Sequence, residues 1–508
     1  MEGLKKIKSA LISVFDKTDL QPLIDLLHQN QVTIYSTGGT YEFIIKMGIP
    51  ATKVEDLTGY PSILGGRVKT LHPKVFGGIL ARRQDTDDAK QMQDFEIPEI
   101  DLVLVDLYPF EKTLATTNDQ SAIIEKIDIG GISLIRAAAK NFEDVLVVAS
   151  VDFYDEVIDL LKTHNASSSL AQRKLFAARA FAVSSHYDTA IFNYFNNDKI
   201  IPAFKQSEHR HQTLRYGENP HQKGWFFGNL SERFVQLHGK EISYNNLLDL
   251  DAGVQIISDF AEPTVAILKH NNACGLASRE HLLTAWKDAL AGDPVSAFGG
   301  VIVCNQAING QTAKEINKLF FEIILAPGYD EAAMGILKSK KNRIILRANS
   351  SQAPDYVFRS ALNGALVQQR DSKKESPADL DFVTYKKSNA DEIEDLLFAN
   401  IIVKHSKSNA IVLVKNKQLI ASGVGQTSRV DALRHAIAKA EAFGFNLEGS
   451  VLASDAFFPF ADSVEIAHKA GITAIVQPGG SIRDKDSIDY CNNNSLAMAF
   501  SGVRHFKH

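Results

Sequence analysis

Short apolar runs alternate with helical segments through the first part of the chain, and this alternation constrains the fold more than any other feature. Runs made mostly of apolar residues occupy 10–15, 32–35, 101–107 and 145–149, and segments with helical spacing follow them. Strands that alternate with helices form parallel sheets with helices on both faces. The sequence therefore predicts an α/β domain, in which residues 154–195 are mostly helical.

Two loops of this part have the composition of an anion site. Residues 36–40 (Ser-Thr-Gly-Gly-Thr) follow the second strand and open a helix. Hydroxyls, backbone N–H groups and the positive end of a helix dipole bind phosphate, although the same residues also form ordinary turns. In residues 65–73, Arg67 and Lys69 face one side of an extended segment, beside Thr70. We expect the two loops to bind one anion; the alternative is a pair of solvated turns.

The second half contains a buried strand with an abrupt polar end. The apolar residues 265–268 stop at Lys269, His270 and two asparagines. In α/β proteins, ligands bind at the rim formed by the carboxyl ends of strands. An ordinary polar turn has the same composition. The shaped loop upstream carries the Arg215 guanidinium and the His221 imidazole, and these two groups could converge with Lys269 and His270 on one anionic ligand.

Length and composition set the limits of the fold and of the partners. The 508 residues predict two to four domains, which we place at 1–196 and 213–508 with a polar linker at 197–212. The net charge of -5 argues against a nucleic-acid partner. The three cysteines are far apart and do not predict a disulfide or a metal site. No apolar run approaches the roughly 18 residues of a membrane span, so we expect a cytoplasmic protein without a membrane partner.

Five motifs of the first half occur in a specific order. After the two loops come residues 107–110 (Leu-Tyr-Pro-Phe), 127–131 (Ile-Asp-Ile-Gly-Gly) and 137–141 (Ala-Ala-Ala-Lys-Asn). Together they resemble the IMP cyclohydrolase domain of the family that joins AICAR transformylase to IMP cyclohydrolase. The resemblance implies a methylglyoxal-synthase-like, parallel-sheet fold and the closure of FAICAR to IMP. By position it implies a catalytic set of Lys69, Tyr108, Asp128 and Lys140. It also implies phosphate and nucleotide contacts from Ser13, Lys17, Thr37, Gly38, Thr40, Arg67 and Thr70.

The second half resembles the AICAR transformylase part of the same family. The motifs include residues 215–222, 269–275, 296–300, 423–429 and 454–460. The resemblance implies two cytidine-deaminase-like subdomains, a homodimer, and formyl transfer from the co-substrate 10-formyltetrahydrofolate to AICAR. Two blocks that place an acidic residue and phenylalanine after a helix also predict two related subdomains. By position the catalytic residues are Lys269, His270 and Asn409. The implied substrate contacts are Arg215, Tyr216, His221, Phe298, Arg429, Phe457 and Asp462.

Three departures from cytidine deaminases and from the family pattern accompany these motifs. The segment at Asp455 lacks the Cys and His ligands that zinc requires, so we expect no catalytic metal. Phe15 stands where the family often has a second serine, which removes one hydroxyl contact. Ala273 replaces a common proline, so the loop after Asn272 is expected to be less rigid.

The residue types suit both reactions. In ring closure a carboxamide nitrogen attacks the formyl carbon and water leaves, which requires a fixed geometry, oxyanion stabilisation and proton transfer. Lys69 and Lys140 would stabilise the oxyanion, while Asp128 and Tyr108 would move protons, in an order that the sequence leaves open. In formyl transfer His270 would take the amine proton. Two alternatives are a phosphate-eliminating lyase like methylglyoxal synthase and a nucleotide- or folate-binding regulatory protein without turnover.

Overall fold

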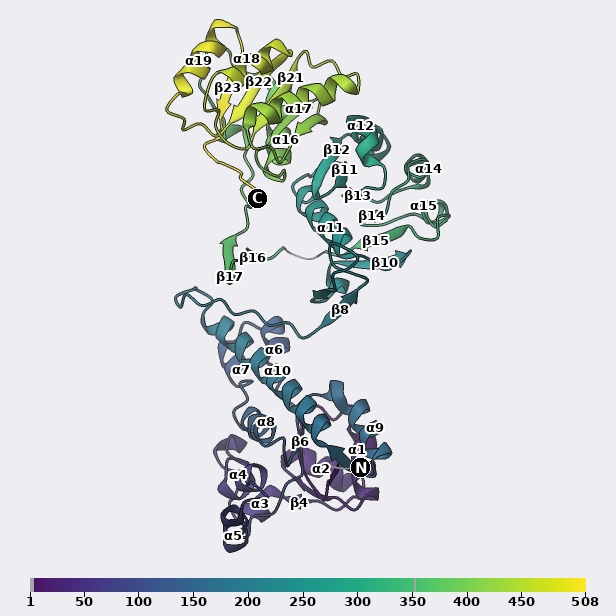
Figure 1. Cartoon of the computed structure of the whole chain (residues 1–508), viewed down its shortest axis with the longest axis vertical. Coiled ribbons are helices and arrows are strands. Elements are labelled where there is room, and N and C mark those ends of the chain that lie inside the picture. Colours follow the sequence, from purple (N-terminus) through teal and green to yellow (C-terminus); the bar gives the residue numbers. More distant parts are fainter. Residues whose placement is uncertain (1–3, 351–352) are drawn as a thin grey trace. The chain divides into compact units, whose positions relative to one another are not determined.

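The chain folds into two compact units. The computed structural model describes residues 4–350 and 353–508, and the units are Met1–His209 and Arg210–His508 (Figure 1). Within the described residues, none of the helices has both the length and the apolar character needed to cross a membrane.

The first unit is built on a five-stranded parallel sheet, as the alternation of strands and helices predicts. The strands are β2 (Ser9–Ser13), β3 (Thr33–Ser36), β4 (Thr52–Lys53), β5 (Leu102–Val105) and β6 (Leu146–Val148). Their order in the sheet is β4-β3-β2-β5-β6. From β2 the chain adds β3 and β4 on one side of the sheet, and it then continues with β5 and β6 on the other side of β2. Ligands of open α/β sheets bind at such a reversal point, here between β2 and β5.

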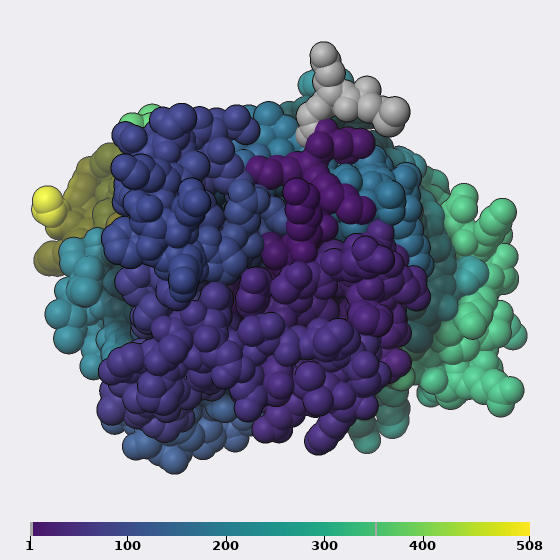
Figure 2. Space-filling model, turned by 90° about the horizontal axis from the view of Figure 1, so that it is seen from below, coloured from purple at the N-terminus to yellow at the C-terminus, as the bar shows by residue number. Residues whose placement is uncertain are grey.

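Helices cover both faces of this sheet because successive strand residues point to opposite faces. Ala10 and Ile12 pack with α1 (Leu20–Gln29) and α9 (Tyr154–Thr163). Leu11, between them, packs on the other face with α4 (Pro73–Leu80), α8 (Gly130–Lys140) and α10 (Leu170–Phe195). In Figure 2 the purple and blue segments of this unit form one continuous face.

The smaller elements of the first unit connect these layers. A short antiparallel pair joins β1 (Leu4–Lys6) to β7 (Ser167–Ser169). A capping box between Ser169 and Gln172 starts the long helix α10. The remaining helices are α2 (Gly38–Lys46), α3 (Val54–Thr58), α5 (Thr86–Asp94), α6 (Phe110–Thr116) and α7 (Gln120–Ile124), with 3-10 turns η1 (Leu64–Gly66) and η2 (Val151–Phe153).

The second unit contains a twelve-stranded sheet made of two matching halves. In order across the sheet, the first half is β10 (Phe234–His238), β15 (Ile344–Ala348), β14 (Ile323–Ala326), β13 (Val301–Cys304), β11 (Thr264–Lys269) and β12 (Asn272–Ser278). The second half continues with β20 (Gln418–Gly423), β19 (Ile411–Lys415), β21 (Ser450–Ser454), β22 (Ile472–Gln477), β23 (Ala497–Phe500) and β18 (Asp381–Phe382).

Both halves have the same topology, which confirms the prediction of two related subdomains. Each half has an antiparallel hairpin, then three mutually parallel strands, then an antiparallel edge strand. The halves join where β12 pairs antiparallel with β20, with Ala277 opposite Gln418. As a result, the turn of the first hairpin lies beside the open end of the second hairpin.

The helices of the second unit also repeat. One face of the sheet packs against α11 (Tyr244–Ile257) and α16 (Ala390–Lys404). The other face packs against α12 (Leu282–Gly292), α14 (Gly310–Ile316) and α15 (Glu331–Leu337) in the first half, and against α17 (Arg429–Ala442), α18 (Asp462–Lys469) and α19 (Asp484–Asn493) in the second. The short elements are α13 (Pro294–Ala297), η3 (Leu230–Glu232), η4 (Pro377–Asp379) and the hairpins β8 (His211–Leu214) with β9 (Gly224–Phe227) and β16 (Tyr356–Ala361) with β17 (Gly364–Gln369).

Candidate active sites

A cavity of about 530 Å³ lies at the reversal point of the first unit's sheet. The ends of β2 and β5 form its floor, and the first turns of α2 and α8 and the loop at 65–70 form its walls. The predicted residues that line it are Ser13, Lys17, Thr37, Gly38, Thr40, Arg67, Lys69, Thr70, Tyr108 and Asp128. The structure thus brings together every residue predicted for this unit except Lys140.

One end of the cavity combines a helix N-terminus with two lysine side chains. Helix α2 begins at Gly38, and no side-chain cap occupies the N–H groups of its first turn. Ideal Cβ atoms placed on Gly38 and Gly39 would lie 3.6 Å from the Lys69 ammonium and 3.9 Å from the Lys17 ammonium, respectively. Two cations therefore flank a helix N-terminus, where backbone N–H groups and the helix dipole already favour negative charge.

Tyr108 and Asp128 form the opposite part of the cavity. Burial raises the pKa of Asp128. Its carboxylate accepts hydrogen bonds from the backbone N–H groups of Gly131, at 2.6 Å, and Tyr108, which lower the pKa but do not outweigh burial. Burial also raises the pKa of the Tyr108 phenol, and nearby carboxylates, Asp128 foremost, add to the effect. Tyr108 therefore keeps its proton at neutral pH. The Tyr187 hydroxyl fixes this segment because it accepts the Asp128 N–H at 2.8 Å.

Phe15 contributes an aromatic wall instead of a hydroxyl group. Its ring meets the Tyr108 ring edge-on with centroids 5.5 Å apart, and the Lys126 ammonium lies 5.3 Å from its centroid. The backbone N–H of Phe15 donates to the carboxylate of Asp106, whose pKa is raised by burial. The ring thus restricts the orientation of Tyr108.

Arg67 is paired with an acidic residue of the same cavity. Its guanidinium donates to the carboxylate of Glu125, which also lines the cavity. Both side chains are more than half exposed, so the pair can open at little cost. Glu125 and Asp106 were not predicted as site residues; only their place in the folded cavity reveals them.

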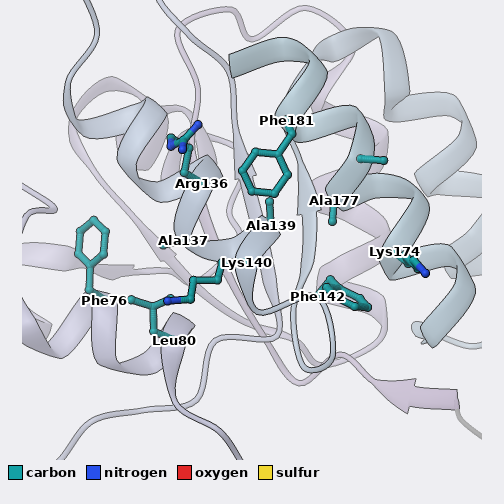
Figure 3. A pocket seen from close by; sticks show the side chains of 11 residues that line it. Phe76, Leu80, Arg136, Ala137, Ala139, Lys140, Phe142, Lys174, Ala177 and Phe181 are labelled. Carbon is teal, nitrogen blue, oxygen red and sulfur yellow. The ribbon is translucent and has the colours of Figure 1, made fainter. Parts of the chain in front are cut away.

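Lys140 is placed away from this cavity. It is the last residue of α8, whose first residue lines the cavity, and eleven helical residues span about 16 Å. Lys140 instead lines a separate groove together with Arg136, Lys174 and the rings of Phe142 and Phe181 (Figure 3). Its catalytic role stays a prediction.

In the second unit, Lys269 and His270 lie at the turn of a hairpin. His270 and Asn271 form the two-residue connection between β11 and β12, and both have positive φ, at 50° and 67°. This is the type I′ geometry that matches strand twist. The turn is held by Asp249 of α11, which accepts the Asn271 N–H at 2.6 Å and whose pKa is raised by burial. His270 is exposed, and the Lys269 ammonium donates to the Phe298 carbonyl at 2.8 Å.

Asn409 comes from the other half of the sheet to the same edge. The pairing of β12 with β20 brings the first hairpin turn beside the segment before β19, where Asn272 Oδ1 accepts the Lys407 N–H at 3.0 Å. Asn409 Nδ2 donates to the Gln426 carbonyl at 2.9 Å. Asn272 and Lys407 are 135 residues apart in the chain and thus meet because of the sheet topology rather than through sequence proximity.

Arg429 joins three parts of this edge. Its Nη2 donates to Asn409 Oδ1 at 2.9 Å and to Asp455 Oδ1 at 2.8 Å, and its Nη1 donates to the Phe457 carbonyl at 3.1 Å. Asp455 also accepts the Ala410 N–H at 3.1 Å. The Asp455 side chain is fully buried and that of Arg429 is 10% exposed. Asp455 and Asp249 were not predicted as site residues. Each is an acidic residue whose hydrogen-bond partner, Arg429 or Asn271, can be identified only from the folded structure.

The other predicted substrate contacts lie on separate elements. Arg215, Tyr216 and His221 belong to the β8–β9 hairpin, where the Arg215 guanidinium stacks 4.7 Å from the Tyr216 ring centroid. A bond of 3.1 Å from Asn245 Nδ2 to the Glu218 carbonyl connects this hairpin to α11. Phe298 follows α13 and is 60% exposed, Phe457 follows β21, and Asp462 begins α18. Among residues 4–350 and 353–508, no cluster of His, Cys, Asp or Glu could hold a metal ion.

Comparisons with known proteins match both units. The model described as AICARFT/IMPCHase bienzyme matches residues 138–439, which is more than half of the chain, and the MGS-like domain model matches residues 19–133. The chain belongs to the AICARFT/IMPCHase bienzyme family. It is therefore an enzyme with AICAR formyltransferase and IMP cyclohydrolase activities, and the family implies a folate co-substrate. A regulatory protein without turnover is not supported.

Three proteins of one description match all or nearly all of the chain. The "Bifunctional purine biosynthesis protein PurH" of Bacteroides thetaiotaomicron is 60% identical over 508 residues, which is 100% of both chains. The protein of the same description from Acetivibrio thermocellus is 47% identical, with 99% of this chain and 100% of that protein covered. The one from Aquifex aeolicus is 45% identical, with 98% and 100% covered. A solved structure, "Crystal structure of ForH", is 35% identical over 37% of this chain and 96% of its own, with a TM-score of 0.33.

Proposed function

We propose that the cavity of the first unit closes FAICAR to IMP. We further propose that the edge formed by Lys269, Asn409 and Arg429 transfers the formyl group of 10-formyltetrahydrofolate to AICAR. The observation that carries the first assignment is the cavity itself, in which an anion cradle faces a protonated phenol and a buried carboxylate across one small volume.

In ring closure, the cradle at α2 would hold the substrate's phosphate between Lys17 and Lys69. The imidazole ring would then extend toward Tyr108 and Asp128. The raised pKa of the Tyr108 phenol makes it the group that holds a proton for the departing hydroxyl. Asp128 would accept the proton that the carboxamide nitrogen loses, and Lys69 would stabilise the oxyanion.

In formyl transfer, the exposed imidazole of His270 would take the proton of the attacking amine. The Lys269 ammonium would stabilise the tetrahedral intermediate, and the proton held by His270 would pass to the folate nitrogen as its bond to the formyl carbon breaks. Both ends of the Asn409 amide have protein partners, so a direct contact with the formyl group would require one of those bonds to open. We therefore assign Asn409 the role of orienting Arg429, which would bind AICAR.

A homodimer and a cytoplasmic location are further proposals that rest on the family resemblance. The position of Lys140 supports the homodimer, because a role in ring closure would require a second copy to bring this lysine to the cavity. The span of about 16 Å along α8 separates the two within one chain.

The direct experiment supplies AICAR and 10-formyltetrahydrofolate and follows tetrahydrofolate and IMP. We expect both products in equal amounts after an initial lag in IMP. If tetrahydrofolate forms but IMP does not, while added FAICAR also stays open, the assignment of the first unit's cavity is wrong. If no tetrahydrofolate forms but added FAICAR closes to IMP, only the assignment of the transfer edge is wrong; if added FAICAR stays open as well, both assignments fail.

A further inference from the structure

The C-terminal segment 501–508 contacts the proposed transfer edge as an irregular strap. It follows β23 and forms no helix or strand, yet its His505 side chain is 1% exposed. His505 Nδ1 lies 2.7 Å from Asp371 Oδ2, and its Nε2 lies 3.2 Å from Glu375 Oε1. The other carboxylate oxygen of Glu375 accepts the Asn400 amide at 2.9 Å. One imidazole is therefore held by a carboxylate at each ring nitrogen.

The charge state of this arrangement follows from its partners. Burial alone would lower the pKa of His505, but the hydrogen bonds to Asp371 and Glu375 outweigh burial and raise it to about 9. At neutral pH both ring nitrogens consequently carry protons and donate to carboxylates, which makes both bonds charge-assisted. Such bonds fix the position of the ring and hence of the chain that carries it.

The strap contacts the transfer edge at two points. The backbone N–H of His505 donates to the Asp455 carbonyl at 3.0 Å. Two residues later, the Lys507 carbonyl accepts the Ser408 N–H at 2.8 Å, and the Lys507 N–H donates to Ser408 Oγ at 3.0 Å. Asp455 is the buried partner of Arg429, and Ser408 directly precedes Asn409 in the chain.

We propose that His505 is a positioning residue for formyl transfer. Clamped between Asp371 and Glu375, it holds the strap against Asp455 and Ser408. These two residues in turn keep Arg429 and Asn409 in place. The inference rests on the proposed role of Arg429 and Asn409 in transfer, and it adds a group that touches neither substrate.

The test replaces His505 by glutamine, which retains one hydrogen bond and removes the charge. We expect kcat/KM for AICAR in formyl transfer to fall about tenfold or more, chiefly through a higher KM, because small displacements of binding groups have effects of this order. Closure of added FAICAR should keep its wild-type rate, since that reaction belongs to the other unit. The matched control is His435→Gln, at an exposed position of α17, which should change neither reaction.

A merely structural role would give a different result. In that case His505→Gln would unfold at a lower temperature, yet the folded protein would transfer formyl groups with wild-type kcat and KM; this outcome overturns the proposal. If His505→Gln does not fold, Asp371→Asn weakens the same clamp at its more exposed carboxylate and should raise KM for AICAR in the same direction. A wild-type KM in folded Asp371→Asn then overturns the proposal instead.

One further variant separates this inference from the proposed function. Arg429→Lys should impair transfer whether or not the strap matters. If Arg429→Lys slows transfer and His505→Gln does not, only the strap inference is wrong. If neither variant affects transfer, the assignment of the edge itself is wrong.

Discussion

Replacement of Arg429 by lysine should separate the geometry of the transfer edge from its charge. The guanidinium makes three hydrogen bonds through two nitrogens, to Asn409, Asp455 and Phe457. A lysine ammonium can keep the ion pair with the fully buried Asp455, which prevents the loss of about 3–5 kcal/mol that an unpaired buried charge causes. It cannot reproduce the planar fork that reaches all three acceptors.

The expected magnitude follows from the two acceptors that lose their donor. The Asn409 and Phe457 oxygens each lose a bond to a charged group, worth about 1.5 kcal/mol. If both losses are expressed in the transition state, they total about 3 kcal/mol, or roughly a hundredfold in rate. We therefore expect kcat/KM for AICAR in formyl transfer to fall about a hundredfold.

The assay follows tetrahydrofolate release at varied AICAR, with ring closure of FAICAR as the internal reference. The matched control is Arg434→Lys on the same helix, where the arginine is 62% exposed and should tolerate the change. A folded Arg429→Lys protein whose transfer rate falls by less than about threefold would refute the assignment, because that corresponds to under 0.7 kcal/mol or so.

Three further outcomes are expected. Tyr108→Phe removes the protonated phenol and should slow FAICAR closure about a hundredfold or more in a stopped assay, with formyl transfer unchanged; unaltered closure would exclude Tyr108 as the proton donor. Asp371 and Glu375 raise the pKa of His505 to about 9. The clamp therefore stabilises the folded state fully below about pH 6.5, and this stabilisation is lost as the pH rises through 9. The free energy of unfolding should fall by about 3 kcal/mol over that range. Denaturant titrations at both ends of this range should show that loss in the wild type and little of it in His505→Gln; equal losses would contradict the charged clamp. If a second copy supplies Lys140, mixing inactive Lys69→Met and Lys140→Met chains should restore about a quarter of the ring-closure rate. No recovery argues against a site that two copies share.

The sequence was most informative about secondary structure in the first unit. Apolar runs that alternate with segments of helical spacing predicted the parallel sheet, and in the structure the neighbouring residues Leu11 and Ile12 pack in opposite layers. The order of the strands could not be predicted from the sequence, because local patterns do not specify which strands pair. The reversal between β2 and β5, which locates the cavity, is a long-range property.

The candidate sites divide in the same way. Cations and hydroxyls on glycine-rich loops, such as Lys69 and Thr37, carry a local signal that sequence reasoning can use. Acids that serve as partners carry none, because Asp249 and Asp455 are unremarkable until a turn or a guanidinium is folded against them. The distance of Lys140 from the cavity likewise depends on the direction in which α8 runs, which cannot be predicted from a sequence motif.

The division of the two reactions between the two units is tested most directly by His270→Ala. With AICAR and 10-formyltetrahydrofolate supplied, we expect this variant to release no tetrahydrofolate, while FAICAR added to the same protein closes to IMP at the wild-type rate. The reciprocal variant Lys69→Met should transfer formyl groups and accumulate FAICAR. If His270→Ala remains folded and loses both activities, the two reactions do not occupy separate sites in the two units.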